Sequence, residues 1–348
     1  MWIDNKIVKE DLEYINSCDF ISWDKLRNKT IFVTGTTGLI GQNLVNGLLY
    51  SNIKRNLNLK ILGLVRNIEK ANDKFKSQLQ ETNALKFVVG DVRDFEYPEC
   101  NIDYIVHGAS ITASKDFVEK PEEVKSIAID GTKHVLELAR TKKVSSFVYL
   151  SSMEVYGYPE KGHVCTENES YDFNPNEPRN SYPIAKLECE KLCKEYYEKY
   201  GISTKSIRLA QTFGPGVDYD DNRIFAQFAR CVIENKDIVL HTKGETERCY
   251  LYTADVVTAI LTVLLNGNSG EIYNAANPET YCSIKDMANI MCDEICKGKI
   301  NTKVNEHKKT EYLNTVFYLL NIDKIKRLNW EYRFSLKKSY ERLIIYEQ

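Results

Sequence analysis

The sequence predicts an α/β fold in which a doubly wound parallel sheet is joined to a smaller C-terminal α/β domain. Three observations support this prediction. Short apolar runs rich in β-branched and aromatic residues alternate with longer segments of helical spacing. A glycine-rich turn links the first of these runs to an apolar helix. The chain has 348 residues, of which 43% are hydrophobic and 28% charged, so it can bury one large core or two joined ones.

The expected strands are apolar along their whole length, which is typical of parallel strands covered by helices on both faces. The segments between them have the spacing of crossover helices, and the one at 182–201 ends at Gly201, a frequent C-terminal stop. A repeated strand and crossover helix predicts a doubly wound sheet. The strands are expected at 30–35, 61–65, 86–90, 104–109, 146–152 and 205–210.

Composition and charge exclude several classes of protein. The formal net charge of -2 gives no overall attraction to nucleic acid or anionic lipid. No apolar run approaches the roughly 18 to 20 residues of a membrane-spanning helix, and the N-terminus lacks the pattern of a secretory signal. We therefore expect a cytoplasmic protein with neither nucleic acid nor a membrane as partner. The ten cysteines include no CxxC pair, so we expect reduced thiols and no metal site.

The turn after the first strand reads TGTTGLIG at 34–41, with three glycines spaced GxxGxxG. Glycines let the backbone turn sharply and approach a pyrophosphate, which the following helix N-terminus stabilises with its free N–H groups. Glycines alone also fit a plain turn, but strand, turn and helix follow here in the order that a dinucleotide site requires. The expected cofactor contacts at this turn are Gly35, Thr37, Gly38, Leu39, Ile40 and Gly41.

Two further positions concern the adenosine end of the dinucleotide. Arg66 follows the second strand, where an enzyme that prefers NAD usually carries an acidic side chain, and its cationic fork suits a 2′-phosphate. This favours NADP(H), with NAD(H) as the other option; the alternative is a solvated strand-end arginine. Asp91, after the third strand, could hold the adenine amino group or serve as a turn residue. Val92 and Ala109 complete the expected cofactor contacts.

Tyr182 and Lys186 lie four residues apart in NSYPIAK, which puts both side chains on one face of a helix. The ammonium group can then lower the pKa of the phenol and orient a nicotinamide ribose, while Tyr182 moves a proton. Ser152, at the end of the fifth strand, can donate a hydrogen bond to the reacting oxygen. Together these residues fit reversible carbonyl/alcohol chemistry with a hydride carried by a nicotinamide.

With these motifs in hand, the chain resembles the extended short-chain dehydrogenase/reductases, the NAD(P)-dependent epimerase/dehydratase group that acts on nucleotide sugars. The resemblance covers nearly the whole chain. Its motifs occur in the family order: TGTTGLIG, GDVRD, HGAS, SSMEVYG, YPIAK, RLAQTFGPG and RCYLYTADVV.

The resemblance implies a Rossmann domain at 1–210, to which 250–274 returns, and a substrate domain at 211–348 that closes over a nucleoside-diphosphate sugar. It also implies a homodimer. The catalytic residues that it implies are Ser152, Tyr182 and Lys186. Glu154, where dehydratases and decarboxylases of the family have their glutamate, is a further catalytic candidate; it could instead hydrogen-bond substrate hydroxyls, orient Ser152 or be an exposed loop carboxylate. The substrate contacts that we expect are Ser110, Met153, Gln211, Arg223 and Arg248, although each of the two arginines also fits a surface salt bridge.

At three positions the sequence differs from the family pattern, and these differences bear on which reaction and which sugar the protein is suited to. In 4,6-dehydratases of the family the segment after the fifth strand commonly reads Thr-Asp-Glu, with the aspartic acid protonating the departing hydroxyl and the glutamate acting as base. Here it reads Ser152-Met153-Glu154, and a thioether cannot donate that proton. Gln211 and Ala128 stand where the family usually has asparagine, which favours an atypical sugar.

These features give a leading hypothesis and two alternatives. Arg66 and Met153 favour NADPH-dependent reduction of a nucleotide-linked keto sugar or ketose, with a CDP-linked precursor of a capsule or other surface polysaccharide as one candidate. Glu154 argues against it, because a simple reductase needs no base there. The alternative is a 4,6-dehydratase, decarboxylase or epimerase with a tightly held, recycled NAD(P)+. The third hypothesis is a non-catalytic dinucleotide sensor, which the presence of Tyr182 and Lys186 disfavours.

Overall fold

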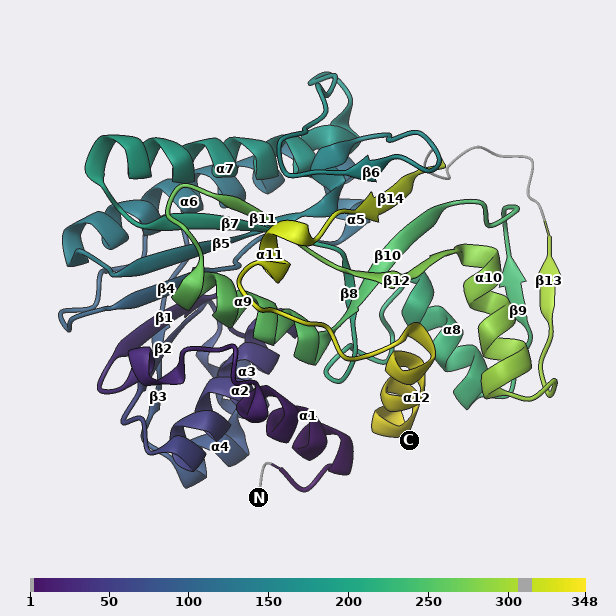
Figure 1. Ribbon diagram of the computed structural model, residues 1–348, viewed down its shortest axis with the longest axis horizontal. Coiled ribbons are helices and arrows are strands. Elements are labelled where there is room, and N and C mark those ends of the chain that lie inside the picture. Colours follow the sequence, from purple (N-terminus) through teal and green to yellow (C-terminus); the bar gives the residue numbers. More distant parts are fainter. Residues whose placement is uncertain (1–2, 306–314) are drawn as a thin grey trace.

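The main sheet is parallel throughout, and it confirms the predicted fold class (Figure 1). The computed structural model describes residues 3–305 and 315–348. The strand order is β11-β7-β5-β4-β1-β2-β3. The six predicted strands are present, and β11 lies at the sheet edge beside β7. The strands are β1 (Thr30–Thr34), β2 (Lys60–Val65), β3 (Leu85–Val89), β4 (Tyr104–His107), β5 (Ser146–Ser152), β7 (Thr204–Leu209) and β11 (Ile272–Ala275).

Helices cover both faces of this sheet, as Figure 1 shows. On one face α6 (Pro121–Lys142) packs against α7 (Ser181–Tyr200), which ends at Gly201 in the left-handed conformation. The other face is covered by α2 (Leu39–Arg55) and α9 (Thr253–Asn266). Because α9 lies between the sheet and neighbouring helices, it is apolar around most of its circumference and nearly all of it is buried.

The order of the strands reverses at β1. The chain runs outward through β2 and β3 on one side, then returns to β4 and β5 on the other. In doubly wound sheets such a switch point leaves a crevice at the carboxyl ends of the strands, and ligands bind there. Two short helices follow these ends along the chain, α3 (Ile68–Lys74) after β2 and α5 (Ser114–Glu119) after β4, whereas α4 (Lys76–Glu81) leads into the start of β3.

The remaining elements lie mostly beside one end of the main sheet and form two smaller sheets (Figure 1). Their core centres on Phe213, Phe225, Tyr250 and Tyr340. The division of the chain into two domains near residue 210 stays a prediction. The strands are β6 (Val164–Cys165), β8 (Gln211–Phe213), β9 (Ile238–Leu240), β10 (Glu247–Tyr252), β12 (Asn277–Ser283), β13 (Thr302–Val304) and β14 (Phe317–Leu320). The helices are α8 (Ile224–Ile233), α10 (Ile284–Asn289), α11 (Asp323–Lys326) and α12 (Leu336–Glu347), with a π-helix at Ile290–Ile295.

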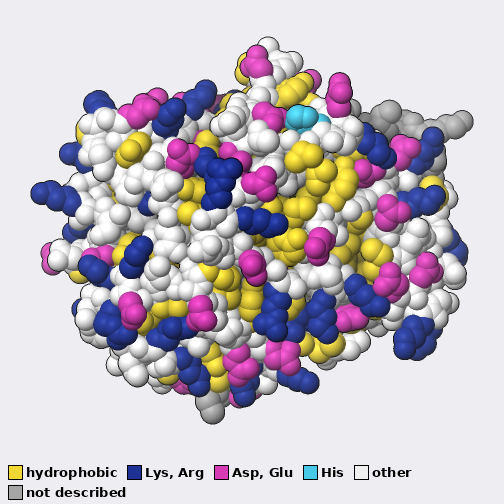
Figure 2. Space-filling model, viewed as in Figure 1, with side chains coloured by type: hydrophobic (Ala, Val, Ile, Leu, Met, Phe, Trp, Pro, Cys, Tyr) yellow, Lys and Arg dark blue, Asp and Glu magenta, His cyan; other side chains and the backbone are white. Residues whose placement is uncertain are grey.

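The face seen in Figure 2 carries charges of both signs side by side, so it has no extended patch of one sign. Hydrophobic side chains gather over the region of β6 and β14, where Val164 is exposed. No helix in residues 3–305 or 315–348 combines the length and apolar character needed to span a membrane.

A buried charge network joins the two ends of the chain. Arg342 on α12 donates to Asp11 Oδ1 at 2.7 Å and to Glu10 Oε2 at 2.7 Å, both on α1 (Lys6–Ser17). The Tyr252 hydroxyl donates to Asp11 Oδ2 at 2.7 Å. Asp11 and Arg342 are only 4% and 6% exposed, so each charge depends on the other for its compensation.

We predict that Arg342→Met lowers the free energy of unfolding by about 3 to 5 kcal/mol, because it leaves the Asp11 carboxylate buried without its counter-charge. Urea denaturation followed by circular dichroism measures this. The control is Lys338→Met on the same helix, where the side chain is 56% exposed and pairs with Glu341; its effect should stay within about 0.5 kcal/mol. Equal midpoints for the two variants would contradict the role given to Arg342.

Candidate active site

The glycine-rich turn forms a tight backbone crossing at the switch point. Gly35 has φ of 73°, and a Cβ there would lie 2.8 Å from the backbone of Gly108, just after β4. A Cβ on Gly41 would lie 2.2 Å from the carbonyl oxygen of Gly35. Gly38 is the N-cap of α2 and supplies no side-chain cap. The turn therefore leaves the helix N-terminus open to an anion, as a pyrophosphate site requires.

The residues expected at the adenosine end of the dinucleotide lie at the ends of two adjacent strands. Arg66 is exposed just after β2, and Asp91 follows β3, which pairs with β2. Asp91 accepts from Arg93 Nε at 2.7 Å and Nη2 at 3.1 Å. These hydrogen bonds lower the pKa of Asp91, with a smaller contribution from the charge of Arg66. The carboxylate of Asp91 is thus charged and close to Arg66.

Two other expected cofactor contacts, Val92 and Ala109, are occupied in holding the sheet together. Val92 is 5% exposed and faces Gly131, where a Cβ would lie 2.7 Å from Val92 Cγ1. The Ala109 N–H donates to Thr34 Oγ1 at 3.1 Å. Their roles as cofactor contacts stay predictions.

The structure brings Ser152, Tyr182 and Lys186 together where β5 meets α7. Tyr182 is 8% exposed and lies close enough to Ser152 for that hydroxyl to lower its pKa. Burial raises the pKa of Tyr182, as does the negative charge of Glu154; the Ser152 hydroxyl and the charges of Arg179 and Arg223 lower it. The phenol is therefore protonated at neutral pH, ready to donate, and loses its proton only with help from nearby cations.

Lys186 supplies a cation beside the phenol. Its Nζ donates to the Leu150 carbonyl at 2.7 Å and lies 5.5 Å from the centroid of the Tyr182 ring. Burial lowers the pKa of Lys186 to about 8, and the neighbouring Cys189 and Glu190 act in the opposite direction. Such a pKa, close to neutral pH, is a property of functional lysines.

Glu154 does not point freely into solvent but pairs with an arginine that the sequence interpretation overlooked. Arg179 Nη2 donates to Glu154 Oε2 at 2.8 Å, and both side chains are about three-quarters buried. The Arg179 guanidinium lies 4.9 Å from the centroid of the Phe117 ring, and Phe117 stacks on Tyr182 with centroids 4.4 Å apart. A continuous stack thus connects the carboxylate to the phenol.

Arg179 was detectable in principle and Phe117 was not. Arg179 precedes Tyr182 by three residues, a spacing that places two side chains on one face of a helix. It lies in a short 3-10 turn (Pro178–Asn180) that runs directly into α7. Phe117, in contrast, reaches the site from α5, more than sixty residues earlier in the chain, and no local sequence pattern predicts that contact.

Of the expected substrate contacts, Gln211 and Arg248 lie side by side, whereas Arg223, Met153 and Ser110 each contact other parts of the chain. Arg248 Nη1 lies 3.5 Å from Gln211 Oε1, because β10 pairs with β8, and within the described residues Arg248 Nε is buried without a hydrogen-bond partner. Arg223 instead pairs with Asp221, at 3.0 Å from Nε to Oδ1. Met153 is only 3% exposed and packs in the core, and the Ser110 hydroxyl donates to the Ile111 carbonyl at 3.3 Å. Contact with substrate stays a prediction for all five residues.

His107 is excluded as a base at neutral pH. Its two ring nitrogens lie 2.7 Å from Thr34 Oγ1 and 3.0 Å from Thr132 Oγ1. Complete burial, together with the charge of Lys186, lowers the pKa of His107 to about 3.

Comparison with known proteins agrees with the dinucleotide-binding fold described above. Residues 31–276 match the family model described as the NAD dependent epimerase/dehydratase family. The match covers well over half of the chain. The chain belongs to the NAD-dependent epimerase/dehydratase family.

Relatives of known function share low sequence identity with this chain but align with most of its length. It is 26% identical to dTDP-D-glucose 4,6-dehydratase of Homo sapiens over 326 residues, which cover 91% of this chain and 89% of that protein. It is 28% identical to UDP-glucuronic acid decarboxylase 1 of Xenopus tropicalis over 261 residues, which cover 74% of this chain and 58% of that protein.

A solved structure shows the shared fold. The dTDP-glucose 4,6-dehydratase DesIV of Streptomyces venezuelae, determined with NAD and TYD bound, superposes with a TM-score of 0.73 at 22% identity, covering 91% of this chain and 96% of that chain. The family resemblance and the fold expected from the sequence are confirmed, and the protein is an NAD(P)-dependent enzyme of the epimerase/dehydratase type.

We predict that Gly41→Ala weakens dinucleotide binding at least about tenfold, because the added Cβ would force apart the Gly35 and Gly41 backbones that shape the turn. Isothermal titration calorimetry with NAD+ and NADP+ measures this. Gly47→Ala is the matched control on the same helix, since its Cβ would meet only side-chain atoms at 3.3 to 3.4 Å. Unchanged affinity in folded Gly41→Ala would contradict a dinucleotide site at this turn.

Proposed function

We propose that this enzyme converts a nucleoside-diphosphate sugar through a transient keto sugar, with no net consumption of its nicotinamide cofactor. The observation that carries the proposal is Glu154, a partly buried carboxylate held by Arg179 next to Ser152 and Tyr182. A base in this place can move a proton at the carbon beside a ketone, which dehydratases, decarboxylases and epimerases need and a simple reductase does not. The family match supports the same class.

The residues present fit a nicotinamide dinucleotide. The turn at Gly35 and Gly41 has no room for a Cβ, the N-terminus of α2 is uncapped by a side chain, and the Tyr182–Lys186 pair lies at the same edge of the sheet. When bound, the oxidised nicotinamide would take a hydride from the sugar carbon that bears the reacting hydroxyl and later give it back.

The chain's own residues perform the proton transfers. Tyr182 acts first as a phenolate, which the Lys186 charge stabilises. It accepts the proton of the sugar hydroxyl as the ketone forms, is a neutral phenol while the keto sugar is bound, and returns that proton at the end. Ser152 lies beside Tyr182 and keeps its oxygen directed at the reacting oxygen. Glu154, oriented by Arg179, handles the proton on the neighbouring carbon.

Met153 narrows the choice within this class. Elimination of water needs an acid for the departing hydroxyl, and the thioether of Met153 is buried in the core at that position. Loss of carbon dioxide from a sugar carboxylate beside the ketone needs no such acid, and neither does epimerisation next to the ketone. We therefore favour decarboxylation or epimerisation over 4,6-dehydration.

Arg66 favours the other hypothesis, net reduction by NADPH, because its guanidinium suits a 2′-phosphate and a net reductase must exchange its cofactor. A homodimer and a cytoplasmic location stay predictions.

The deciding experiment incubates the purified enzyme with UDP-, dTDP-, CDP- and GDP-linked sugars, uronates among them, and follows products by NMR together with absorbance of the reduced nicotinamide. We expect product without net change in that absorbance. Oxidation of one NADPH for each product would overturn the proposal and establish the reductase.

Two variants test the proposed roles of Tyr182 and Glu154 in the same assay. Tyr182→Phe should lose about 10²- to 10⁴-fold in turnover, because the proton carrier is gone. Glu154→Gln should still form the ketone but stall before the carbon-centred step, so reduced nicotinamide accumulates without final product. Glu160→Gln, a nearby exposed glutamate, is the control and should behave as wild type. Full turnover by Glu154→Gln would remove Glu154 from the mechanism.

We predict that Arg66→Gln raises the Kd for NADP+ about tenfold and leaves the Kd for NAD+ within about twofold, because only NADP+ carries the 2′-phosphate that pairs with the guanidinium. Fluorescence titration of both cofactors measures the two constants. A wild-type enzyme that binds NAD+ more tightly than NADP+ would show that Arg66 is a solvated surface residue.

A further inference from the structure

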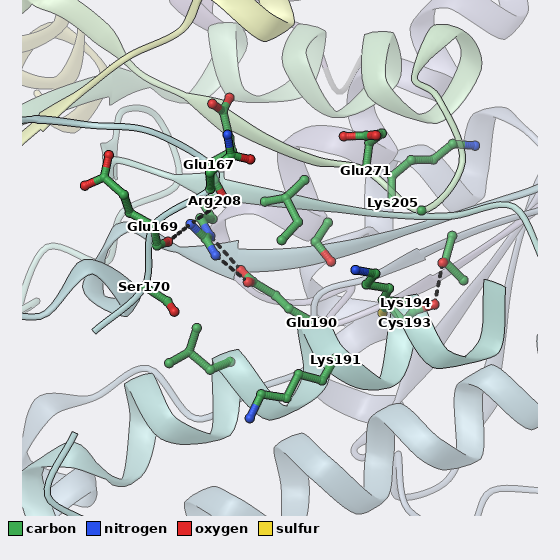
Figure 3. Close-up of a pocket in the computed structure, with 16 residues that line it drawn as sticks. Glu167, Glu169, Ser170, Glu190, Lys191, Cys193, Lys194, Lys205, Arg208 and Glu271 are labelled. Atoms are coloured by element: carbon green, nitrogen blue, oxygen red, sulfur yellow. Dashed lines mark hydrogen bonds and ion pairs between the residues drawn. The ribbon is translucent and has the colours of Figure 1, made fainter. Parts of the chain in front are cut away.

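A buried ion pair lies behind the candidate active site, between α7 and the main sheet. Glu190 on α7 accepts from Arg208 on β7 through both oxygens, with Nε to Oε1 at 3.0 Å and Nη2 to Oε2 at 2.8 Å (Figure 3). Glu190 is 5% exposed and Arg208 is 2% exposed. The pair forms part of the wall of a cavity of about 230 Å³ that none of the expected site residues lines.

The same carboxylate also holds the strand that carries Ser152. The Ser151 hydroxyl donates to Glu190 Oε1 at 2.5 Å, and Ser151 immediately precedes Ser152 on β5. On α7, Glu190 follows Lys186 by four residues and Tyr182 by eight, so the three side chains lie along one face of the helix. One carboxylate therefore sets the position of the end of β5 relative to the helix that bears Tyr182 and Lys186.

Arg208 extends this support to the segment that carries Glu154. Its guanidinium lies 4.9 Å from the centroid of the Tyr156 ring, at the end of the 3-10 turn Met153–Tyr156. The Tyr156 hydroxyl donates to Asn274 Oδ1 at 2.7 Å, which ties the turn to β11. Arg208 Nη1 also donates to the Glu169 carbonyl at 2.7 Å. The ion pair thus supports both sides of the candidate active site.

Glu190 also supplies a negative charge near Lys186. The titratable groups that face Lys186 are His107 from β4, Tyr149 from β5, and Tyr182, Cys189 and Glu190 from α7. Burial lowers the pKa of His107 and raises those of Tyr149, Tyr182 and Cys189, so these four are neutral at pH 7. Glu190 is the carboxylate in this set, and its charge opposes the loss of the Lys186 proton.

We propose that Glu190 is a positioning residue for the reaction at Tyr182: it fixes the end of β5 against α7 and keeps Lys186 in its charged form. The proposal rests on the function proposed above, because it gives Glu190 a task only if Tyr182 and Lys186 carry the chemistry. An ion pair that only stabilised the fold would leave the charge of Lys186 and the pH dependence of turnover unchanged.

The test compares Glu190→Gln with the wild-type holoenzyme across pH. Loss of the carboxylate charge favours neutral Lys186, so the alkaline limb of the kcat profile should move to lower pH by roughly 0.5 to 1 unit. At its optimum, kcat should fall about tenfold or more, with a smaller change in KM. Glu188→Gln on the same helix, where the side chain is 45% exposed and lies 3.7 Å from Lys191, is the control and should keep the wild-type profile.

Three further variants separate charge, geometry and folding. Ser151→Ala removes the hydrogen bond but not the charge, so kcat should fall without movement of the alkaline limb. Glu190→Asp keeps the charge and should restore the limb. Glu190→Gln combined with Arg208→Gln leaves no buried unpaired charge; it should recover thermal stability and retain the shifted limb. A folded Glu190→Gln variant, or a folded Glu190→Gln/Arg208→Gln double variant, with the wild-type limb would overturn the proposal.

A measurement that needs no turnover distinguishes this proposal from the proposed function. Nitrogen NMR of the Lys186 ammonium, assigned with Lys186→Arg, gives its titration midpoint directly, and we expect a lower midpoint in Glu190→Gln. A shifted midpoint in an enzyme that turns over no nucleotide sugar would support the action of Glu190 on Lys186 and reject the proposed function. An unshifted midpoint in an active enzyme would reject the positioning role alone.

Discussion

The candidate site depends on one constraint: parallel strands buried on both faces all end at the same edge of the sheet. Because β1 to β5 are parallel, the residues after their carboxyl ends meet at one crevice although they come from widely separated parts of the chain. The tight crossing of Gly35, Gly41 and Gly108 fixes where β1 and β4 diverge. A bulkier residue at these glycines would move the strand ends, and with them the end of β5 where Ser152 lies.

Much of this could be predicted from the sequence, because its signals are local. Apolar runs, the glycine spacing and the four-residue spacing of Tyr182 and Lys186 each follow from the periodicity of one element. The unpredicted contacts join elements far apart in sequence. Phe117 stacks on Tyr182 across 65 positions, and Arg342 pairs with Asp11 across 331. Such contacts depend on how the helices and the sheet pack against one another, and the periodicity of a single sequence does not predict that packing.

The paired departures at Met153 and Glu154 have one physical explanation. Met153 packs in the core beneath the turn, where an acid would be desolvated and without a partner. Glu154 is the next residue, yet the 3-10 turn directs it to Arg179, which donates to its carboxylate. The turn thus retains a carboxylate, which under the proposed function acts at carbon, and lacks an acid for a departing oxygen. This combination supports chemistry beside a ketone without loss of water.

Lys186 connects the stability of the fold with the chemistry. A cation buried between β5 and α7 is costly, and burial lowers the pKa of Lys186 to about 8 even though neighbouring groups act in the opposite direction. A more apolar surrounding would leave it neutral and unable to stabilise a phenolate; a stronger counter-ion in direct contact would hold it charged but weaken its effect on Tyr182. Glu190 supplies a negative charge near Lys186 without being a direct counter-ion, because its oxygens already accept hydrogen bonds from Arg208 and Ser151. Its charge therefore reaches Lys186 without a direct salt bridge, so the ammonium stays available to the phenol.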